Sequence, residues 1–501
     1  MPHPPLARLL ALAFSLLICL PGFSQPVQPP PYTDSPQIPD TPAYIRAREV
    51  MDLINKADAA PYLQYIQDSF APQLRDAVPT GTHAAAYNDL LSRSGKLTPH
   101  SARSYTPALP ETHAVLIVRT SISEQWLAIV LDVDDKPPHK ITALAFNRAR
   151  TPTNVPKPEK LTDSEIAKEL GAYVHRLAKQ DAFSGSVLLA KAGPPLLTLA
   201  VGLANRDFKA PNTIDTKFNL GSMNKMFTAV AILQLAEQGK LSLDDPLAKH
   251  LDTSWLSQNI LDRVKIRHLL THTSGLGSYF NDIFERTSRA HFRAVNDYKP
   301  LVINETLAFE PGAQQRYSNT GMLIAGAIVE KASGTDYFDY IRQHVTGPAA
   351  MTRTDCYDLD KVNESLALGY ERRFSKSGTE YFNNLFFHVI RGGPAGGGYS
   401  TVSDLHRFDQ ALRSGKLLKK ESLAAAWTPT QTARSFNYGL GFFVEQSPVG
   451  RIVGHGGDFA GISAQLRMYL DSGHTLAVLS NYDGAAPLVE SKARELITQG
   501  R

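Results

Sequence analysis

Residues 218–239 read FNLGSMNKMFTAVAILQLAEQG, and this stretch joins a candidate nucleophile to a candidate buried helix. Ser222 and Lys225 form the only S-x-x-K of the chain, and a largely apolar run follows until Gly239. The run predicts a helix with Ser222 at its N-terminus and Lys225 about one turn further on the same face. A desolvated lysine can take the proton of a neighbouring serine hydroxyl. A capping serine with a solvated lysine is the structural alternative, and the local sequence does not decide between the two.

A second motif, Tyr317-x-Asn319, follows a proline-glycine turn and precedes an apolar helix expected at 321–331. The Y-x-N strings at Tyr279 and Tyr381 lack this setting, so we reject them. A tyrosine hydroxyl near the serine and the lysine can relay a proton to a leaving group, and an asparagine amide can donate a hydrogen bond to substrate. This second motif therefore favours the catalytic interpretation of Ser222.

A third motif, His455-Gly456-Gly457, lies between strand-like segments at 451–454 and 462–470. Paired glycines allow a substrate backbone to approach a strand closely. A turn or bulge beside a surface histidine is the structural alternative. The chain contains no G-x-S-x-G and no H-E-x-x-H string, which argues against an α/β-hydrolase and a zinc hydrolase.

The order and approximate spacing of the three motifs resemble those of the serine β-lactamase and penicillin-binding-protein superfamily. The chain looks most similar to the branch that holds class C β-lactamases, D-alanyl-D-alanine carboxypeptidases, D-aminopeptidases and related esterases. Three further stretches support the resemblance: LLTHTSGL at 269–276, GGGYST at 396–401 and YGLG at 438–441. In this family the first of these stretches resembles a turn between helices, so we interpret His272 as structural.

The resemblance implies an α+β catalytic domain of the β-lactamase/transpeptidase-like fold, with an antiparallel sheet flanked by helices and a helical subdomain. It implies that Ser222 forms an acyl-enzyme and that Lys225 and Tyr317 share the acid-base work. Which of them takes the serine proton is left open, because coupled groups titrate as a unit. The other expected site residues are the substrate-binding Asn319, His455, Gly456 and Gly457, and the backbone N–H groups of Ser222 and Asp458 as an oxyanion hole. No metal ligand and no cofactor is expected.

The composition is that of an ordinary globular protein. The 501 residues carry a formal net charge of +4, with 43% hydrophobic and 20% charged residues. This balance excludes wholesale disorder and gives no indication of a nucleic-acid or membrane-surface binder. The two cysteines exclude a disulfide-stapled scaffold, and we interpret Cys356 as a buried filler rather than a nucleophile.

The N-terminus has the pattern of a secretory signal peptide. Arg8 precedes the 12-residue apolar run 9–20, which is shorter than the roughly 20 residues of a membrane span. We expect residues 1–24 to be cleaved, so that no stable membrane span remains and the mature protein is periplasmic or secreted. A lipoprotein anchored at Cys19 is the less favoured alternative.

Two proline-rich breaks divide the chain, at an expected tether over 25–42 and an expected linker over 149–160. Residues 43–148 predict a small α+β module, and residues 161–501 form the expected hydrolase domain. The module's expected helices are 43–57, 61–70 and 83–91, and its expected strands are 113–119, 125–133 and 141–145. Their order loosely resembles the NTF2-like fold, and binding, spacing or dimerisation is the default interpretation of its role.

We therefore expect an exported serine hydrolase that cleaves a small ester, amide or peptide, a cell-wall-derived peptide among the candidates, with weak β-lactamase activity at most. His455 stands where efficient β-lactamases and DD-peptidases usually carry a lysine, and an unperturbed histidine is mostly uncharged at neutral pH. The alternatives are a D-Ala-D-Ala carboxypeptidase, a true class C-like β-lactamase, and a non-catalytic penicillin-binding-like assembly protein. The sequence does not indicate an oligomeric state.

Overall fold

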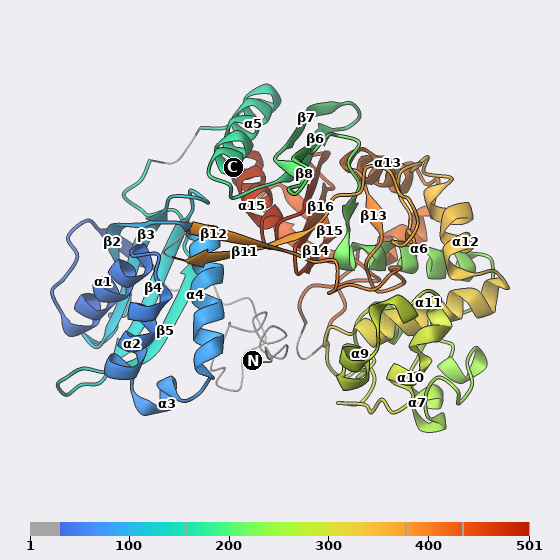
Figure 1. Cartoon of the computed structure of the whole chain (residues 1–501), viewed down its shortest axis with the longest axis horizontal. Helices are drawn as coiled ribbons and strands as arrows, with labels where there is room; N and C mark the ends of the chain where they lie inside the picture. Colours follow the sequence, from blue (N-terminus) through green and yellow to red (C-terminus); the bar gives the residue numbers. More distant parts are fainter. Residues whose placement is uncertain (1–30, 157–158, 376–377, 433–434, 500–501) are drawn as a thin grey trace. The chain divides into compact units, whose positions relative to one another are not determined.

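The computed structural model describes residues 31–156, 159–375, 378–432 and 435–499. The expected signal peptide over 1–24, with Cys19, and the first part of the tether lie outside the described residues. The described residues form two compact units (Figure 1). The first unit holds the residues up to 156 with the segment 372–381, and the second unit holds the remainder.

The first unit contains helices followed by an antiparallel sheet with the strand order β1-β2-β3-β4-β5. Its helices are α1 (Pro42–Asn55), α2 (Ala59–Ser69), α3 (Pro72–Arg75) and α4 (Thr80–Ser94), and its strands are β1 (Tyr32–Ser35), β2 (Leu97–Tyr105), β3 (His113–Thr120), β4 (Trp126–Val133) and β5 (Ile141–Arg148). Val50 and Ile54 of α1 share one buried cluster with Leu116 and Ile129 of the sheet. This arrangement is the α+β class expected from the sequence.

Strand β1 corrects the expected tether. Proline disfavours a central strand but is tolerated at a sheet edge, and β1 is the edge strand beside β2. The carboxylate of Asp34 in β1 is buried and accepts hydrogen bonds from Nε of Arg103 at 2.9 Å and from its Nη2 at 3.1 Å. Residues 32–35 are therefore part of the module's sheet. Strand β2 was also missed, because its polar residues alternate with few apolar ones.

A six-stranded antiparallel sheet with the order β14-β15-β16-β17-β6-β7 forms the centre of the second unit (Figure 1). Its strands are β6 (Gly185–Lys191), β7 (Pro195–Val201), β14 (Phe443–Ser447), β15 (Gly450–Phe459), β16 (Ile462–Tyr469) and β17 (His474–Ser480). The short strands are β8 (Leu203–Asn205), β9 (Ala210–Pro211), β10 (Phe218–Asn219) and β13 (Tyr399–Ser400), and β11 (Tyr370–Ser375) pairs with β12 (Gly378–Asn383). Strand β17 is buried along its whole length, as a strand covered on both faces must be.

Terminal helices cover this sheet. Helix α5 (Asp163–Lys179) packs against α15 (Ala486–Thr498), and both contact the sheet. Helix α5 begins with a capping box, in which Thr162 Oγ1 accepts from the Glu165 backbone N–H and the Glu165 carboxylate accepts from the Thr162 backbone N–H at 2.8 Å. The sequence offered Thr162 or Asp163 as the cap, and Thr162 is the one used.

Between the strands the chain forms further helices, most of which make up a helical subdomain. They are α6 (Asn224–Glu237), α7 (Gln258–Arg263), α8 (Ile266–Leu270), α9 (Asp282–Arg286), α10 (Lys299–Val302), α11 (Asn319–Ser333), α12 (Tyr337–Ile341), α13 (Val402–Arg413) and α14 (Lys420–Ala426), with short helical turns η3 (Gly221–Met223), η4 (Leu247–Lys249), η5 (Arg289–His291), η6 (Val295–Tyr298) and η7 (Arg342–Thr346). Helix α6 is apolar on all sides and packs against α11. No helix within the described ranges has the length and apolar composition needed to span a membrane.

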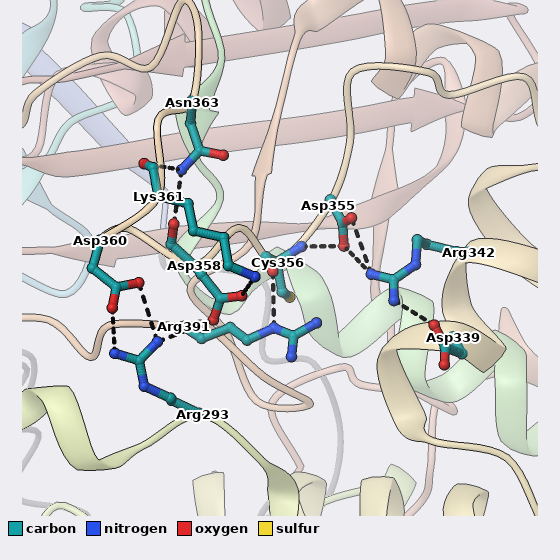
Figure 2. A network of polar contacts seen from close by, with 10 residues as sticks. All are labelled: Arg293, Asp339, Arg342, Asp355, Cys356, Asp358, Asp360, Lys361, Asn363 and Arg391. Atoms are coloured by element: carbon teal, nitrogen blue, oxygen red, sulfur yellow. Dashed lines mark hydrogen bonds and ion pairs between the residues drawn. The ribbon is translucent and has the colours of Figure 1, made fainter.

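Charged side chains fix the segment that follows η7. Arg342 donates to both carboxylate oxygens of Asp355 at 3.1 Å, and Arg293 donates to Asp360 at 2.5 Å. Figure 2 shows both arginines with these partners. Lys361 adds an ion pair to the same segment. Because these arginines come from η7 and from the region before η6, they attach the segment to the helical subdomain that carries the site.

Candidate active site

Ser222 lies in η3, between β10 and α6, and its turn requires glycine. Gly221 has a φ of +49°, a left-handed conformation that side chains disfavour. Its N–H donates to Asn219 Oδ1 at 2.9 Å, which closes the turn before the serine. The expected helix therefore begins two residues later than Ser222, and η3 presents the serine ahead of it.

Lys225 is fully buried in the first turn of α6. Its Nζ lies 2.9 Å from Ser222 Oγ, 2.9 Å from Asn319 Oδ1 and 2.5 Å from the backbone oxygen of Ala395. Burial lowers the pKa of the Lys225 amine well below its ordinary value of 10.5. The amine and the serine hydroxyl are thus in direct hydrogen-bond contact in a desolvated site.

Tyr317 places its ring face over the lysine, with Lys225 Nζ 4.8 Å from the ring centroid. Burial raises the pKa of Tyr317 above its usual value of 10, and the neighbouring Ser222 side chain opposes this rise with a smaller effect. The side chain remains 36% exposed, so solvent moderates this rise. The phenol therefore carries its proton at neutral pH.

Asn319 is the first residue of α11, and both ends of its amide are engaged. Oδ1 accepts from Lys225, and Nδ2 donates to Ser278 Oγ at 3.2 Å. The preceding residue, Ser318, caps the helix by accepting the Gly321 N–H at 2.8 Å. The structure thus brings Ser222, Lys225, Tyr317 and Asn319 together around one polar centre.

The ring of His455 is buried and points into the protein. Its Nδ1 lies 2.5 Å from the Gly456 oxygen and its Nε2 2.9 Å from the Tyr438 hydroxyl. Because the carbonyl can only accept, Nδ1 donates and Nε2 accepts the tyrosine proton. Burial lowers the pKa of His455 to about 3, so the imidazole is neutral at physiological pH. We expected this side chain to contact substrate, but both its nitrogens already bond to the protein.

The two glycines after His455 have different surroundings. A Cβ at Gly457 would lie 1.8 Å from the backbone oxygen of Leu220 and 2.9 Å from the Ser222 nitrogen, so β15 touches the serine turn here. A Cβ at Gly456 would instead meet the end of the flexible Gln465 side chain at 2.8 Å. Of the two glycines, Gly457 is therefore the one that the position of Ser222 requires.

The Asp458 backbone nitrogen also lies close to the serine turn, because a Cβ at Gly221 would be 3.0 Å from it. Strand β14 pairs with β15 up to Gly454, whereas β16 pairs with β15 as far as Phe459. The half of β15 from His455 onward therefore turns its other edge toward η3. Such an edge suits an extended substrate backbone.

Sequence reasoning missed His272 as a neighbour of the site. Its ring lies 4.4 Å from the Tyr317 ring and 4.6 Å from the Tyr438 ring, measured between centroids, and its Nδ1 accepts the Ser318 N–H at 3.2 Å. Burial lowers the pKa of His272 well below 6.5, so it too is neutral. The LLTHTSGL stretch at 269–276 is the sequence feature that could have indicated this position. His272 has the structural role expected for it, and this role includes packing against Tyr317.

Asn224 was also missed. Its side chain donates to the Gly393 oxygen at 3.3 Å and accepts the Gly398 N–H at 3.2 Å. These bonds hold the loop that carries the Ala395 oxygen against α6, so Asn224 supports one of the acceptors of Lys225. The three consecutive glycines at 396–398 are the sequence feature that could have indicated a close approach of this loop to α6.

Cys356 is buried, and burial raises the pKa of its thiol to about 12. Arg391 donates to its backbone oxygen at 3.1 Å, as Figure 2 shows. A thiol with so high a pKa is a poor nucleophile, which agrees with the interpretation as a filler. Across the part of the chain that the structure describes, no three His, Cys, Asp or Glu side chains gather as a metal site would need.

The sequence model of the family described as Beta-lactamase matches residues 170–499. The chain belongs to the beta-lactamase family. It is 35% identical over 328 residues to penicillin-binding protein 4* of Bacillus subtilis (strain 168), an alignment that covers 63% of this chain and 71% of the relative. The match to the family leaves residues 1–169 outside it.

Solved structures agree with this assignment to the beta-lactamase family. A penicillin binding protein from Bacillus halodurans is 30% identical, with a TM-score of 0.59, and the match covers 64% of this chain and 99% of that one. A D-stereospecific amidohydrolase from Streptomyces sp. is 26% identical, with a TM-score of 0.55 over 68% of this chain and 100% of that one. The second unit thus has the β-lactamase/penicillin-binding-protein-like fold, and the family is one of serine hydrolases.

Proposed function

We propose that this beta-lactamase family member is an exported serine hydrolase that cleaves ester or amide bonds through an acyl-enzyme on Ser222. The observation that carries the proposal is the contact of the buried Lys225 amine with the serine hydroxyl and two carbonyl oxygens. The apolar run near the N-terminus supports export to the periplasm or the medium.

The hydrogen-bond partners of the Lys225 amine favour this residue as the general base. A neutral amine has two N–H groups and one lone pair. The oxygens of Asn319 and Ala395 can only accept, so they take both N–H groups, and the lone pair of Lys225 faces the Ser222 hydroxyl. The lowered pKa of Lys225 favours this neutral form. We therefore assign the general base of acylation to Lys225.

The proposed reaction uses these groups in the following order. The serine proton moves to Lys225 while Oγ attacks the substrate carbonyl, and the backbone N–H groups of Ser222 and Asp458 hold the resulting oxyanion. Tyr317 gives its proton to the leaving group and regains one from Lys225. Water attacks the ester of the acyl-enzyme with the same groups in reverse, which restores Ser222. Asn319 keeps one N–H for the substrate, because Ser278 takes only the other.

The neutral His455 defines the preferred substrate class. A carboxylate-bearing substrate finds no cation at this position, and a charge-assisted hydrogen bond is worth about 1.5–3 kcal/mol. We propose small uncharged esters and amides as the best substrates and weak turnover of penicillins. The likeness to a D-stereospecific amidohydrolase favours a second candidate, an amide or peptide with a D-residue on the acyl side.

Mass spectrometry after treatment with a fluorophosphonate tests the proposal. The adduct is expected on Ser222, and Ser222→Ala is expected to lose both the label and the hydrolysis of p-nitrophenyl acetate. A label on another serine, with activity retained in Ser222→Ala, would exclude the mechanism. A parallel incubation with a penicillin is expected to give slow labelling of the same serine, and rapid turnover of the penicillin would refute the proposed substrate class.

A further inference from the structure

Two aromatic side chains from different parts of the second unit meet beside the site. Phe459 directly follows Asp458, and Phe280 lies two residues after Ser278, which hydrogen-bonds Asn319. The two rings are stacked, with centroids 6.0 Å apart and planes inclined by 20°. We call Phe280 and Phe459 the aromatic pair. It links the end of β15 to the helical subdomain beside the groups that carry the reaction.

One member of the aromatic pair is fixed and the other is exposed. Phe280 packs against the core and contacts the rings of Tyr279 at 4.7 Å and Phe284 at 4.9 Å between centroids. Phe459 leaves 39% of its surface exposed at the end of the β15–β16 hairpin. A rigid aromatic wall with one exposed ring offers apolar contact area at little conformational cost.

The spacing of the rings restricts how a ligand can use them. Ring faces in contact are separated by about 3.5 Å, so a third ring between two others needs roughly 7 Å. The 6.0 Å between these centroids leaves no such space. An apolar group must therefore lie across the exposed surface of Phe459 and the outer edge of the pair.

The position along β15 places the aromatic pair beside the reacting carbonyl. Side chains two residues apart on a strand point to the same face, so Phe459 shares the face of Gly457, where a Cβ would lie 2.9 Å from the Ser222 nitrogen. Phe459 also directly follows Asp458, whose N–H is the donor proposed to hold the carbonyl oxygen.

We propose that the aromatic pair is a subsite for an uncharged aromatic group on the acyl side of the substrate. The proposal rests on the proposed serine hydrolase function and names its substrate class: esters or amides of arylacetyl-type acids. Burial of the substrate ring against Phe459 raises kcat/KM for such substrates above that for acetyl substrates.

Two p-nitrophenyl esters with the same leaving group test this subsite, the acetate and the phenylacetate. The wild-type protein is expected to prefer the phenylacetate by about 10-fold or more in kcat/KM. Phe459→Ala and Phe280→Ala are expected to lower this preference about 3- to 10-fold, with kcat/KM for the acetate changed less than about 2-fold. Phe459→Leu, which keeps an apolar side chain, is expected to lose less of the preference. Phe208→Ala removes a phenylalanine that is 84% exposed in the β8–β9 turn and is the matched control, expected to behave as wild type.

An unchanged preference in both Phe459→Ala and Phe280→Ala would overturn the subsite, and so would an equal fall for both esters. If Phe280→Ala does not fold, as its melting temperature would show, the two Phe459 variants decide. A preference that follows the leaving group while the acyl group is held constant would also overturn the acyl-side assignment. A protein in which the fluorophosphonate labels no serine, and which hydrolyses neither ester, would refute the hydrolase proposal on which the subsite rests. This outcome differs from failure of the subsite alone, in which both esters are hydrolysed and the preference is unchanged in the variants.

Discussion

Of the adjacent glycines Gly456 and Gly457, replacement of Gly457 by alanine should lower the activity far more than replacement of Gly456. Gly456→Ala and Gly457→Ala add the same methyl group at consecutive positions of β15. At Gly457 the new Cβ would lie 1.8 Å from the Leu220 oxygen, which is backbone and cannot rotate away. At Gly456 it meets the Gln465 amide at 2.8 Å, and that side chain can turn aside.

The size of the effect follows from these contacts. Real Cβ atoms essentially never approach another atom within 3.0 Å, so the serine turn and β15 must separate by about 1.2 Å in Gly457→Ala. A misplacement of about 1 Å can cost 10²-fold in rate, because the serine and the oxyanion donors then no longer face one carbonyl. We expect kcat/KM for p-nitrophenyl acetate to fall by 10²-fold or more in Gly457→Ala. In Gly456→Ala we expect less than a 10-fold fall.

The assay compares kcat/KM and the rate of fluorophosphonate labelling for the two variants and the wild type, with the melting temperature as the check on folding. Gly393→Ala is a suitable control in the same domain, because a Cβ there meets nothing within 4 Å. Near-normal labelling of Ser222 in a folded Gly457→Ala protein would refute the reasoning. A larger loss in Gly456→Ala than in Gly457→Ala would refute it as well.

Three further predictions concern the same unit. Lys225→Ala and Tyr317→Phe should fold and lose about two to four orders of magnitude in kcat on an activated ester, and near-normal turnover in both would remove them from the mechanism. The pKa of His455 falls from 6.5 in the unfolded chain to about 3 in the fold, so its contribution to stability is present above pH 6.5 and is lost as the pH falls toward 3. The melting temperature should therefore drop less between pH 7 and pH 4 in His455→Gln than in the wild type, and equal slopes would exclude this role. A chain that begins at Leu161 should keep its activity on p-nitrophenyl acetate, since all proposed site residues lie beyond that point; a folded but inactive product would show that the first unit contributes to the site.

Local sequence was sufficient for the parts of the fold that depend on neighbours along the chain. The capping box of α5, the apolar helix after Ser222 and the strands around His455 follow from spacing and caps within a dozen residues. The edge strand β1 could not be predicted in this way. Its pairing depends on β2 and on the contact of Asp34 with Arg103, and proline content gives no sign of either.

The same limit applies to the candidate site. The motifs named Ser222, Lys225 and Asn319, and the structure places their side chains within hydrogen-bond distance. The orientation of the His455 ring depends instead on its hydrogen bond with Tyr438, which lies 17 residues earlier in the chain. No pattern in the residues around His455 distinguishes a ring that points into the protein from one that points outward. The segment 372–381 also groups with the first unit, although the sequence gives no break around it.

The protonation states bear on whether the proposed site needs a fixed charge. The raised pKa of Tyr317 and the lowered pKa of His455 leave both groups uncharged at neutral pH, and the lowered pKa of the buried Lys225 favours its neutral amine. In the proposed mechanism, transfer of the serine proton creates a cation on Lys225 and an anion at the substrate oxygen at the same moment. The oxygens of Asn319 and Ala395 already accept hydrogen bonds from Lys225, so little reorganisation would be needed around the cation when it forms. A permanent cation in place of His455 would oppose charging of Lys225, so a buried neutral histidine at this position favours the proposed transfer of the serine proton to Lys225.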